Sequence, residues 1–162
     1  MNTGQMLLTL GALILLSSLV LRFNRAVLTS DEIMYNSKFN VLASSLATSL
    51  IEEAKGKAFD KNTVTAAVNN TNQLSTQLQA ESGEVYPDFD DFDDFNNFVR
   101  VDSTLPSAVF YITSKVNYVS MSNPDVVSLT PTWRKAITVT VMSPSMKDPV
   151  QLSSIYTYWY YR

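Results

Sequence analysis

The chain has 162 residues and a net charge of −3, with 46% hydrophobic and 17% charged residues. It contains no histidine and no cysteine, so it lacks the commonest general base, the commonest metal ligand, and any thiolate site or disulfide. The acidic balance leaves no basic patch to neutralise phosphates, so we expect no nucleic-acid partner.

The first 21 residues contain no charged side chain, and the first charge is Arg22. As an α-helix they would span roughly 30 Å, the thickness of the hydrocarbon core of a bilayer. We therefore predict a membrane-spanning segment over residues 1–21. One alternative is a cleaved signal peptide, although the basic start of such a peptide is missing. Another is a buried helix of a soluble protein, which would need apolar partners on every side.

Residues 22–58 continue the helical pattern, and proline is absent before Pro87. Asp31 and Glu32 are where we expect a restart or kink. Apolar residues at helical spacing form one stripe, which we expect to pack on the protein's own sheet. The stripe consists of Leu28, Tyr35, Phe39, Leu42, Leu46 and Leu50.

Residues 59–98 read as a polar connector that ends in a loop rich in Asp and Phe. A short helix is predicted at about residues 71–80. The later stretch YPDFDDFDDFNNF places a phenylalanine at every third position, which suits a 3₁₀ turn with the rings on one side. We expect the rings to dock on the core while the carboxylates point to water.

The same loop offers oxygen ligands for a hard cation such as Ca²⁺. The candidate ligands are Asp90, Asp91, Asp93, Asp94 and Asn96. The loop lacks the glycine and the glutamate of an EF-hand. The competing interpretation is a solvated acidic loop held down by its phenylalanines.

Residues 99–162 are predicted to form an antiparallel sheet. Phe110, Ile112, Val116 and Tyr118 alternate with polar residues, as do Ile137, Val139 and Val141 further on. Two more strands are expected, at residues 98–102 and 152–161. The fold class is therefore α+β, with a long N-terminal helix packed on a small C-terminal antiparallel sheet.

This layout resembles the type IV pilins and the pseudopilins of type II secretion. The segment LASSLATSLIEEAKGKAFD (residues 42–60) is similar to the second half of the long helix in minor-pilin-like proteins. The run DDFDDFNNF (residues 90–98) looks like the Asp-rich motif that precedes the sheet in some of them. Where the family usually carries glutamate at the fifth position and often a proline near position 22, this chain has Gln5 and Arg22.

The resemblance implies a structural subunit that is anchored in the inner membrane and then assembles with copies of itself into an extracellular helical filament. Gln5 would then satisfy the buried N-terminus of a neighbouring subunit. The expected core-packing residues are Leu7, Leu8, Leu10, Leu13, Ile14, Leu16 and Val20. The aromatic tail either contacts adjacent subunits or forms an internal strand. Its residues are Tyr156, Tyr158, Trp159, Tyr160 and Tyr161.

Two alternatives to a filament subunit stay open: a pseudopilin of a secretion system, and a single-pass anchored binding module that never polymerises. Arg22 and Arg25 follow the apolar segment, and by the positive-inside rule they would place the body in the cytoplasm, against the export that the resemblance implies. We expect no enzymatic activity, no small-molecule substrate and no cofactor beyond the possible Ca²⁺. A glycosidase-like carboxylate pair would need a deep cleft and one raised pKa, which a short exposed Asp run does not offer.

Overall fold

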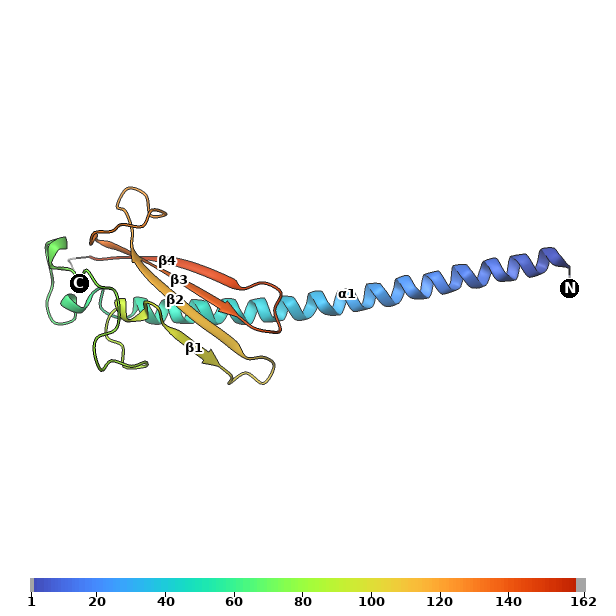
Figure 1. The fold of residues 1–162 in the computed structure, drawn as a ribbon, viewed down its shortest axis with the longest axis horizontal. Coiled ribbons are helices and arrows are strands. Elements are labelled where there is room, and N and C mark those ends of the chain that lie inside the picture. Colours follow the sequence, from blue (N-terminus) through green and yellow to red (C-terminus); the bar gives the residue numbers. More distant parts are fainter. Residues whose placement is uncertain (1, 160–162) are drawn as a thin grey trace. The chain divides into compact units, whose positions relative to one another are not determined.

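A computed structural model describes residues 2–159 and divides the chain into two compact units, residues 1–39 and 40–162. One helix, α1 (Thr3–Lys55), belongs to both units, and four strands follow in the second (Figure 1). The predicted α+β class is confirmed, because the long apolar helix precedes an antiparallel sheet.

In the first unit, α1 runs without interruption through Asp31 and Glu32, so the predicted kink is wrong. Both carboxylates are exposed and stay solvated on the helix surface, which removes any reason for the backbone to break there. Leu28 and Tyr35, which we expected to pack on the sheet, are exposed as well, at 68% and 56%. The predicted stripe is therefore wrong in its front part.

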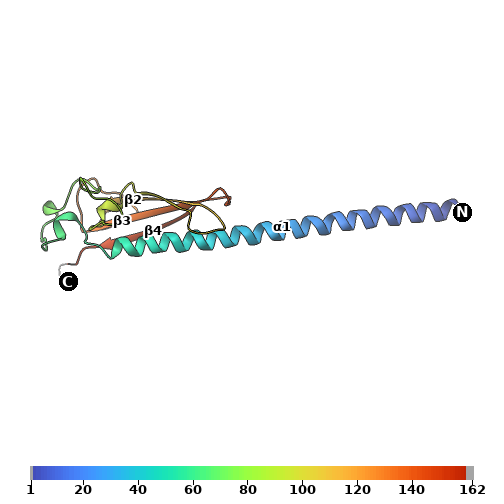
Figure 2. The same ribbon diagram turned by 90° about the horizontal axis from the view of Figure 1, so that it is seen from below.

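In the second unit, the rear of α1 packs on the sheet through a face of small residues (Figure 2). Ala43, Ala47 and Ala54 are fully buried, whereas the predicted Leu42 and Leu46 are only half-buried. Alanine methyl groups let the helix backbone approach the sheet closely, and the larger leucines lie at the margin of that contact. Leu50 is buried as predicted, next to Ile51.

The sheet is an antiparallel meander in the order β1-β2-β3-β4. Its strands are β1 (Val99–Asp102), β2 (Phe110–Tyr118), β3 (Arg134–Met142) and β4 (Val150–Thr157). Burial alternates along β2 and β3, which confirms the predicted period-two pattern. The register places Tyr118, Lys135 and Tyr156 in one row across three strands. A lysine thus occupies a buried position of the sheet.

The connector contains three 3₁₀ turns, η1 (Lys61–Thr63), η2 (Thr71–Gln73) and η3 (Asp93–Phe95). The helix predicted over residues 71–80 shrinks to η2, because the Asn, Thr and Ser side chains there compete for backbone hydrogen bonds. Asn70 caps the turn by accepting from the N–H of Asn72. The Asp/Phe-rich loop is fixed to the end of α1 by a parallel bridge between Ala58 and Asp91.

Candidate functional site

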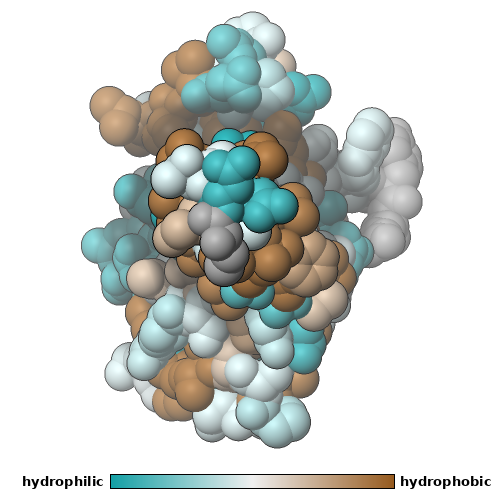
Figure 3. All heavy atoms as spheres, turned by 90° about the vertical axis from the view of Figure 1, so that its right-hand side faces the viewer, coloured by the Kyte–Doolittle hydropathy of each residue, from teal (hydrophilic) through white to brown (hydrophobic). Residues whose placement is uncertain are grey.

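The front of α1, residues 3–21, presents an apolar surface. The seven apolar residues predicted for core packing are each 50–75% exposed, and Gln5 is exposed too. Figure 3 looks at the end of α1 near Asn2 and shows hydrophobic side chains around it. An exposed apolar surface of this extent indicates a protein or lipid interaction site. The helix is long and apolar enough to cross a membrane, which makes it compatible with a membrane anchor.

Two hydroxyl groups on this surface are satisfied by the helix itself. Thr9 Oγ1 donates to the carbonyl oxygen of Met6 at 2.9 Å, and Ser18 Oγ donates to that of Leu15 at 2.8 Å. An unpaired donor would be costly in a medium without water. These two positions are thus suited to an apolar environment.

A second site of chemical interest lies around Lys135 on β3. It is inside the second compact unit, which begins at Asn40 and is called the head below. The Nζ of Lys135 is fully buried and lies 2.5 Å from Oδ1 of Asp93 and 3.0 Å from Oδ2 of Asp60. It also donates to the carbonyl oxygen of Phe59 at 2.8 Å, and it lies 4.5 Å from the centre of the Phe59 ring and 4.9 Å from that of Tyr118. Two carboxylates and two aromatic faces thus surround one buried cation, an arrangement that stabilises it by charge and by cation–π attraction.

Ser75 and Tyr118 complete this cluster. The hydroxyl of Ser75 lies 2.7 Å from Oδ2 of Asp60 and 2.8 Å from Oδ2 of Asp93. A serine hydroxyl carries one proton, so only one of these contacts uses it, and the other needs a proton on a carboxyl group. The Tyr118 hydroxyl lies 2.8 Å from the carbonyl oxygen of Ser75 and 3.1 Å from Oδ2 of Asp60.

The pKa shifts indicate which of the two carboxyl groups takes up a proton first as the pH falls. Burial would raise the pKa of Asp60, but the charge of Lys135 and several hydrogen bonds hold it below its usual value. Burial raises the pKa of Asp93 to about 6, although Lys135 lowers it. Burial also raises the pKa of the Tyr118 hydroxyl, which stays protonated. Asp60 is therefore the ionised partner of Lys135, and Asp93 is the carboxyl group that takes up a proton first.

Asp91 and Asp94 lie at the same turn and face backbone donors on one side. Oδ2 of Asp94 accepts from the N–H groups of Asp90 and Asp91, both at 3.0 Å, and Oδ1 of Asp91 accepts from those of Asp93 and Asp94. Within residues 2–159, the other two oxygens, Oδ2 of Asp91 and Oδ1 of Asp94, are buried without a hydrogen-bond partner. Burial and the charges of Asp93 and Asp94 raise the pKa of Asp91 to about 8, and burial raises that of Asp94.

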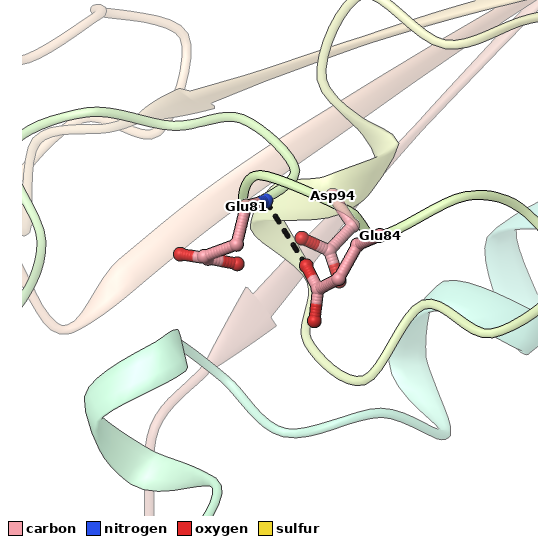
Figure 4. Close-up of side chains that lie close together, drawn as sticks. All are labelled: Glu81, Glu84 and Asp94. Atoms are coloured by element: carbon pink, nitrogen blue, oxygen red, sulfur yellow. Dashed lines mark hydrogen bonds between the residues drawn. The ribbon is translucent and has the colours of Figure 1, made fainter.

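Two glutamates extend the acidic region toward the surface. Figure 4 shows Glu84 next to Asp94, with Glu81 nearby and the Glu81 N–H bonded to Oε2 of Glu84 at 3.0 Å. Gly83, between the two glutamates, has φ +100°, a conformation that glycine adopts without strain. Glu81, Glu84 and Asp94 each offer an oxygen within 4.8 Å of the others, and so do Asp90, Asp91 and Asp94.

The structure brings together only part of the predicted cation ligand set. Asp90, Asp91 and Asp94 form one group, whereas Asp93 faces Lys135. The amide oxygen of Asn96 accepts from the N–H of Val116 at 2.9 Å. Sequence reasoning missed Glu81 and Glu84, although two glutamates flanking a glycine just before the Asp run were an available signal.

The expected solvent exposure of the Asp residues is wrong for three of them. Asp91, Asp93 and Asp94 are at most 2% exposed, and only Asp88 and Asp90 face water. The docking of the phenylalanines is confirmed, because Phe89, Phe92 and Phe95 are buried. These carboxylates are buried together with the rings because they find partners inside the protein. Asp93 pairs with Lys135, and Asp91 and Asp94 accept from backbone N–H groups.

The aromatic tail contacts its own subunit where the structure describes it. The Tyr156 hydroxyl donates to the carbonyl oxygen of Lys57, and its ring lies 5.1 Å from that of Phe92. Tyr158 accepts from the N–H of Val68 and stacks on Trp133 at 5.3 Å. Trp159 is 74% exposed. The predicted last strand begins earlier and ends at Thr157, and Tyr160 and Tyr161 lie outside the described residues.

No protein-family model, no curated protein and no solved structure matches this chain. Its function must therefore be argued from the residues and contacts described above.

Proposed function

We propose that this protein is a structural subunit of an extracellular type IV pilus-like filament, which polymerises through the front of α1. The observation that carries the proposal is the apolar surface between Met6 and Leu21, whose large side chains are all at least half exposed. Burying one such side chain is worth about 1.5–3 kcal/mol. A subunit leaving the membrane can recover this free energy only against similar surfaces, and copies of the same helix supply them.

The head fits a filament shell. Its sheet buries one face against the rear of α1 and leaves the other face rich in Thr, Ser and Asn at exposed or half-exposed positions. Contacts between different patches of neighbouring subunits would be heterologous and would give an open helical polymer. The chain would stay in the inner membrane until it is added to the filament.

Electron microscopy of sheared cell-surface material tests this function. We expect filaments that contain the chain. A Leu13→Gln variant should lose them while still reaching the membrane, because a polar side chain would be buried between helices without a partner. The matched control is Val126→Gln, at an exposed apolar residue of the head. Monomers extracted only with detergent, with no filaments in the wild type, would contradict the proposal and favour the anchored binding module.

The same assay separates a pilus from a pseudopilus and tests Gln5. Long filaments under native expression support a pilus, whereas short ones that appear only on overexpression favour the pseudopilin alternative. The Gln5→Leu variant should reduce filament yield, because leucine cannot accept a hydrogen bond from the N-terminus of a neighbour. A normal yield would contradict the role proposed for Gln5.

A further inference from the structure

The region around Asp94 concentrates carboxyl groups for which the described part of the chain offers few cations. Five carboxyl groups lie in two overlapping groups that share Asp94: Glu81, Glu84, Asp90, Asp91 and Asp94. Lys135 is already engaged by Asp60 and Asp93. Lys61 pairs with Glu81 at 3.4 Å, on the exposed side. One cation near the surface does not balance this cluster.

Two buried carboxylate oxygens in this region lack a hydrogen-bond partner within the described residues. Oδ1 of Asp94 is buried without a partner within residues 2–159, although the other oxygen of the same carboxylate accepts two backbone N–H bonds. The side chain as a whole is 2% exposed. An unpaired buried carboxylate oxygen is costly, because it has given up its water without gaining a donor. Oδ2 of Asp91 is likewise buried without a hydrogen-bond partner among the described residues.

We propose that Glu81, Glu84 and Asp94 bind a divalent cation of the size of Ca²⁺, with the unpaired oxygen of Asp94 as its most buried ligand. Their oxygens lie within 4.8 Å of one another. Two ligands on opposite sides of Ca²⁺, each at 2.3–2.6 Å, are separated by about 4.6–5.2 Å, so one ion reaches all three. Mg²⁺ requires near-octahedral geometry and gives up its bound water reluctantly, so a loop site of this kind favours Ca²⁺.

The arrangement of the ligands fits a loop site. Glu84 and Asp94 lie side by side in Figure 4, and Glu81 reaches the same region from the other end of the Gly83 turn. Glu81 and Glu84 are partly exposed, so water could complete the 6–8 oxygen ligands that Ca²⁺ takes. The ion would link the turn at Gly83 to the η3 turn, which carries Asp93, one of the two carboxylate partners of Lys135.

This proposal does not depend on the filament, because its ligands all lie in the head.

Calorimetric titration of the full chain in detergent micelles tests the proposal, with CaCl₂ added to EDTA-treated and dialysed protein at constant ionic strength. We expect about one Ca²⁺ per chain and Mg²⁺ binding at least tenfold weaker. Thermal unfolding followed in parallel should show a higher midpoint with Ca²⁺ than with EDTA.

The Asp94→Asn variant should lower Ca²⁺ affinity at least tenfold, since it removes the charge while its carbonyl oxygen can still accept the two backbone bonds. Glu84→Gln, at a partly exposed residue, should do the same and covers the case in which the Asp94 variant does not fold. Asp88→Asn is the matched control, because Asp88 is an exposed carboxylate of the same loop outside the cluster. Wild type without Ca²⁺ binding, or equal losses in the Glu84 and Asp88 variants, would overturn the proposal.

Discussion

The front of α1 and the core around Lys135 reverse the usual distribution of side chains. Leucines between Leu7 and Leu21 are more than half exposed, whereas Lys135, Asp60 and Asp93 are at most 2% exposed. The charged core finds its partners within its own chain, through bonds from β3 to the connector and to the η3 turn. The apolar front has no comparable cover among the described residues. The difference indicates that the charges around Lys135 are satisfied within the chain, whereas the front of α1 presents an apolar surface suited to lipid or protein.

Removing the lysine tests the charged core most severely. In the Lys135→Met variant, Asp60 and Asp93 stay buried without their cation, so we expect the free energy of unfolding to fall by about 3–5 kcal/mol. Urea unfolding of the full chain in micelles, followed by tyrosine fluorescence, measures it. Lys115→Met, on the exposed face of β2, is the control and should change stability little. A loss below about 1 kcal/mol would mean that the ion pairs do not support the fold.

The carboxyl groups beside Lys135 predict how stability depends on pH. Asp91 and Asp93 have folded pKa values raised to about 8 and about 6, so the folded state holds more protons than the unfolded state above pH 4. Stability in EDTA should therefore fall from pH 5 to pH 8, by on the order of 2–4 kcal/mol. Asp60 has the opposite sign, and its contribution is lost below about pH 4. Stability that rises from pH 5 to pH 8 would contradict these shifts.

The alanine face of α1 gives a smaller effect within the same head. Ala47→Leu inserts three carbon atoms where the side chain is fully buried, and overpacking of this kind costs about 1–3 kcal/mol. Thr48→Leu, one residue further along on the exposed side, is the matched control. Thermal unfolding of both variants measures the difference. Equal midpoints for the two would show that the helix does not pack closely through Ala47.

The smallest expected effect concerns the Tyr118 hydroxyl. Tyr118→Phe removes its contacts with the carbonyl oxygen of Ser75 and with Asp60, but Asp60 keeps Lys135 and Ser75 as donors. We expect a loss of about 1 kcal/mol, the net worth of one buried hydrogen bond. Tyr111→Phe on the other face of β2 is the control, and unfolding in urea resolves the two. A loss as large as that of Lys135→Met would mean that the hydroxyl, rather than the lysine, organises the cluster.

Elements with a local pattern were predictable from the sequence. The alternation through Ile112 and Val139 identified the strands, and the uncharged stretch before Arg22 identified the front of the helix. The helix face was predicted only in part: Phe39 and Leu50 are buried, whereas the fully buried positions between them are Ala43 and Ala47 and not Leu42 and Leu46.

The burial of Asp93 could not be found from the loop alone, because its partner Lys135 is 42 positions away along the chain. One signal did exist. Lys135 lies two residues before Ile137 and four before Val139 on the same strand, so its side chain is on the same buried face of the sheet. A buried lysine requires an acidic partner. The orphan oxygens of Asp91 and Asp94 depend on the geometry of a single turn, which residue spacing does not encode.

Cysteine crosslinking along α1 tests the central claim most directly, since the chain contains no cysteine of its own. Surface material carrying Leu13→Cys, treated with a short bis-maleimide, should give a ladder at multiples of the chain mass. The same treatment of Leu129→Cys, a fully exposed residue of the head, should give far less. A Leu13→Cys variant that remains at the mass of a single chain, while wild-type levels of protein reach the surface, would contradict the claim that the front of α1 is buried against copies of itself.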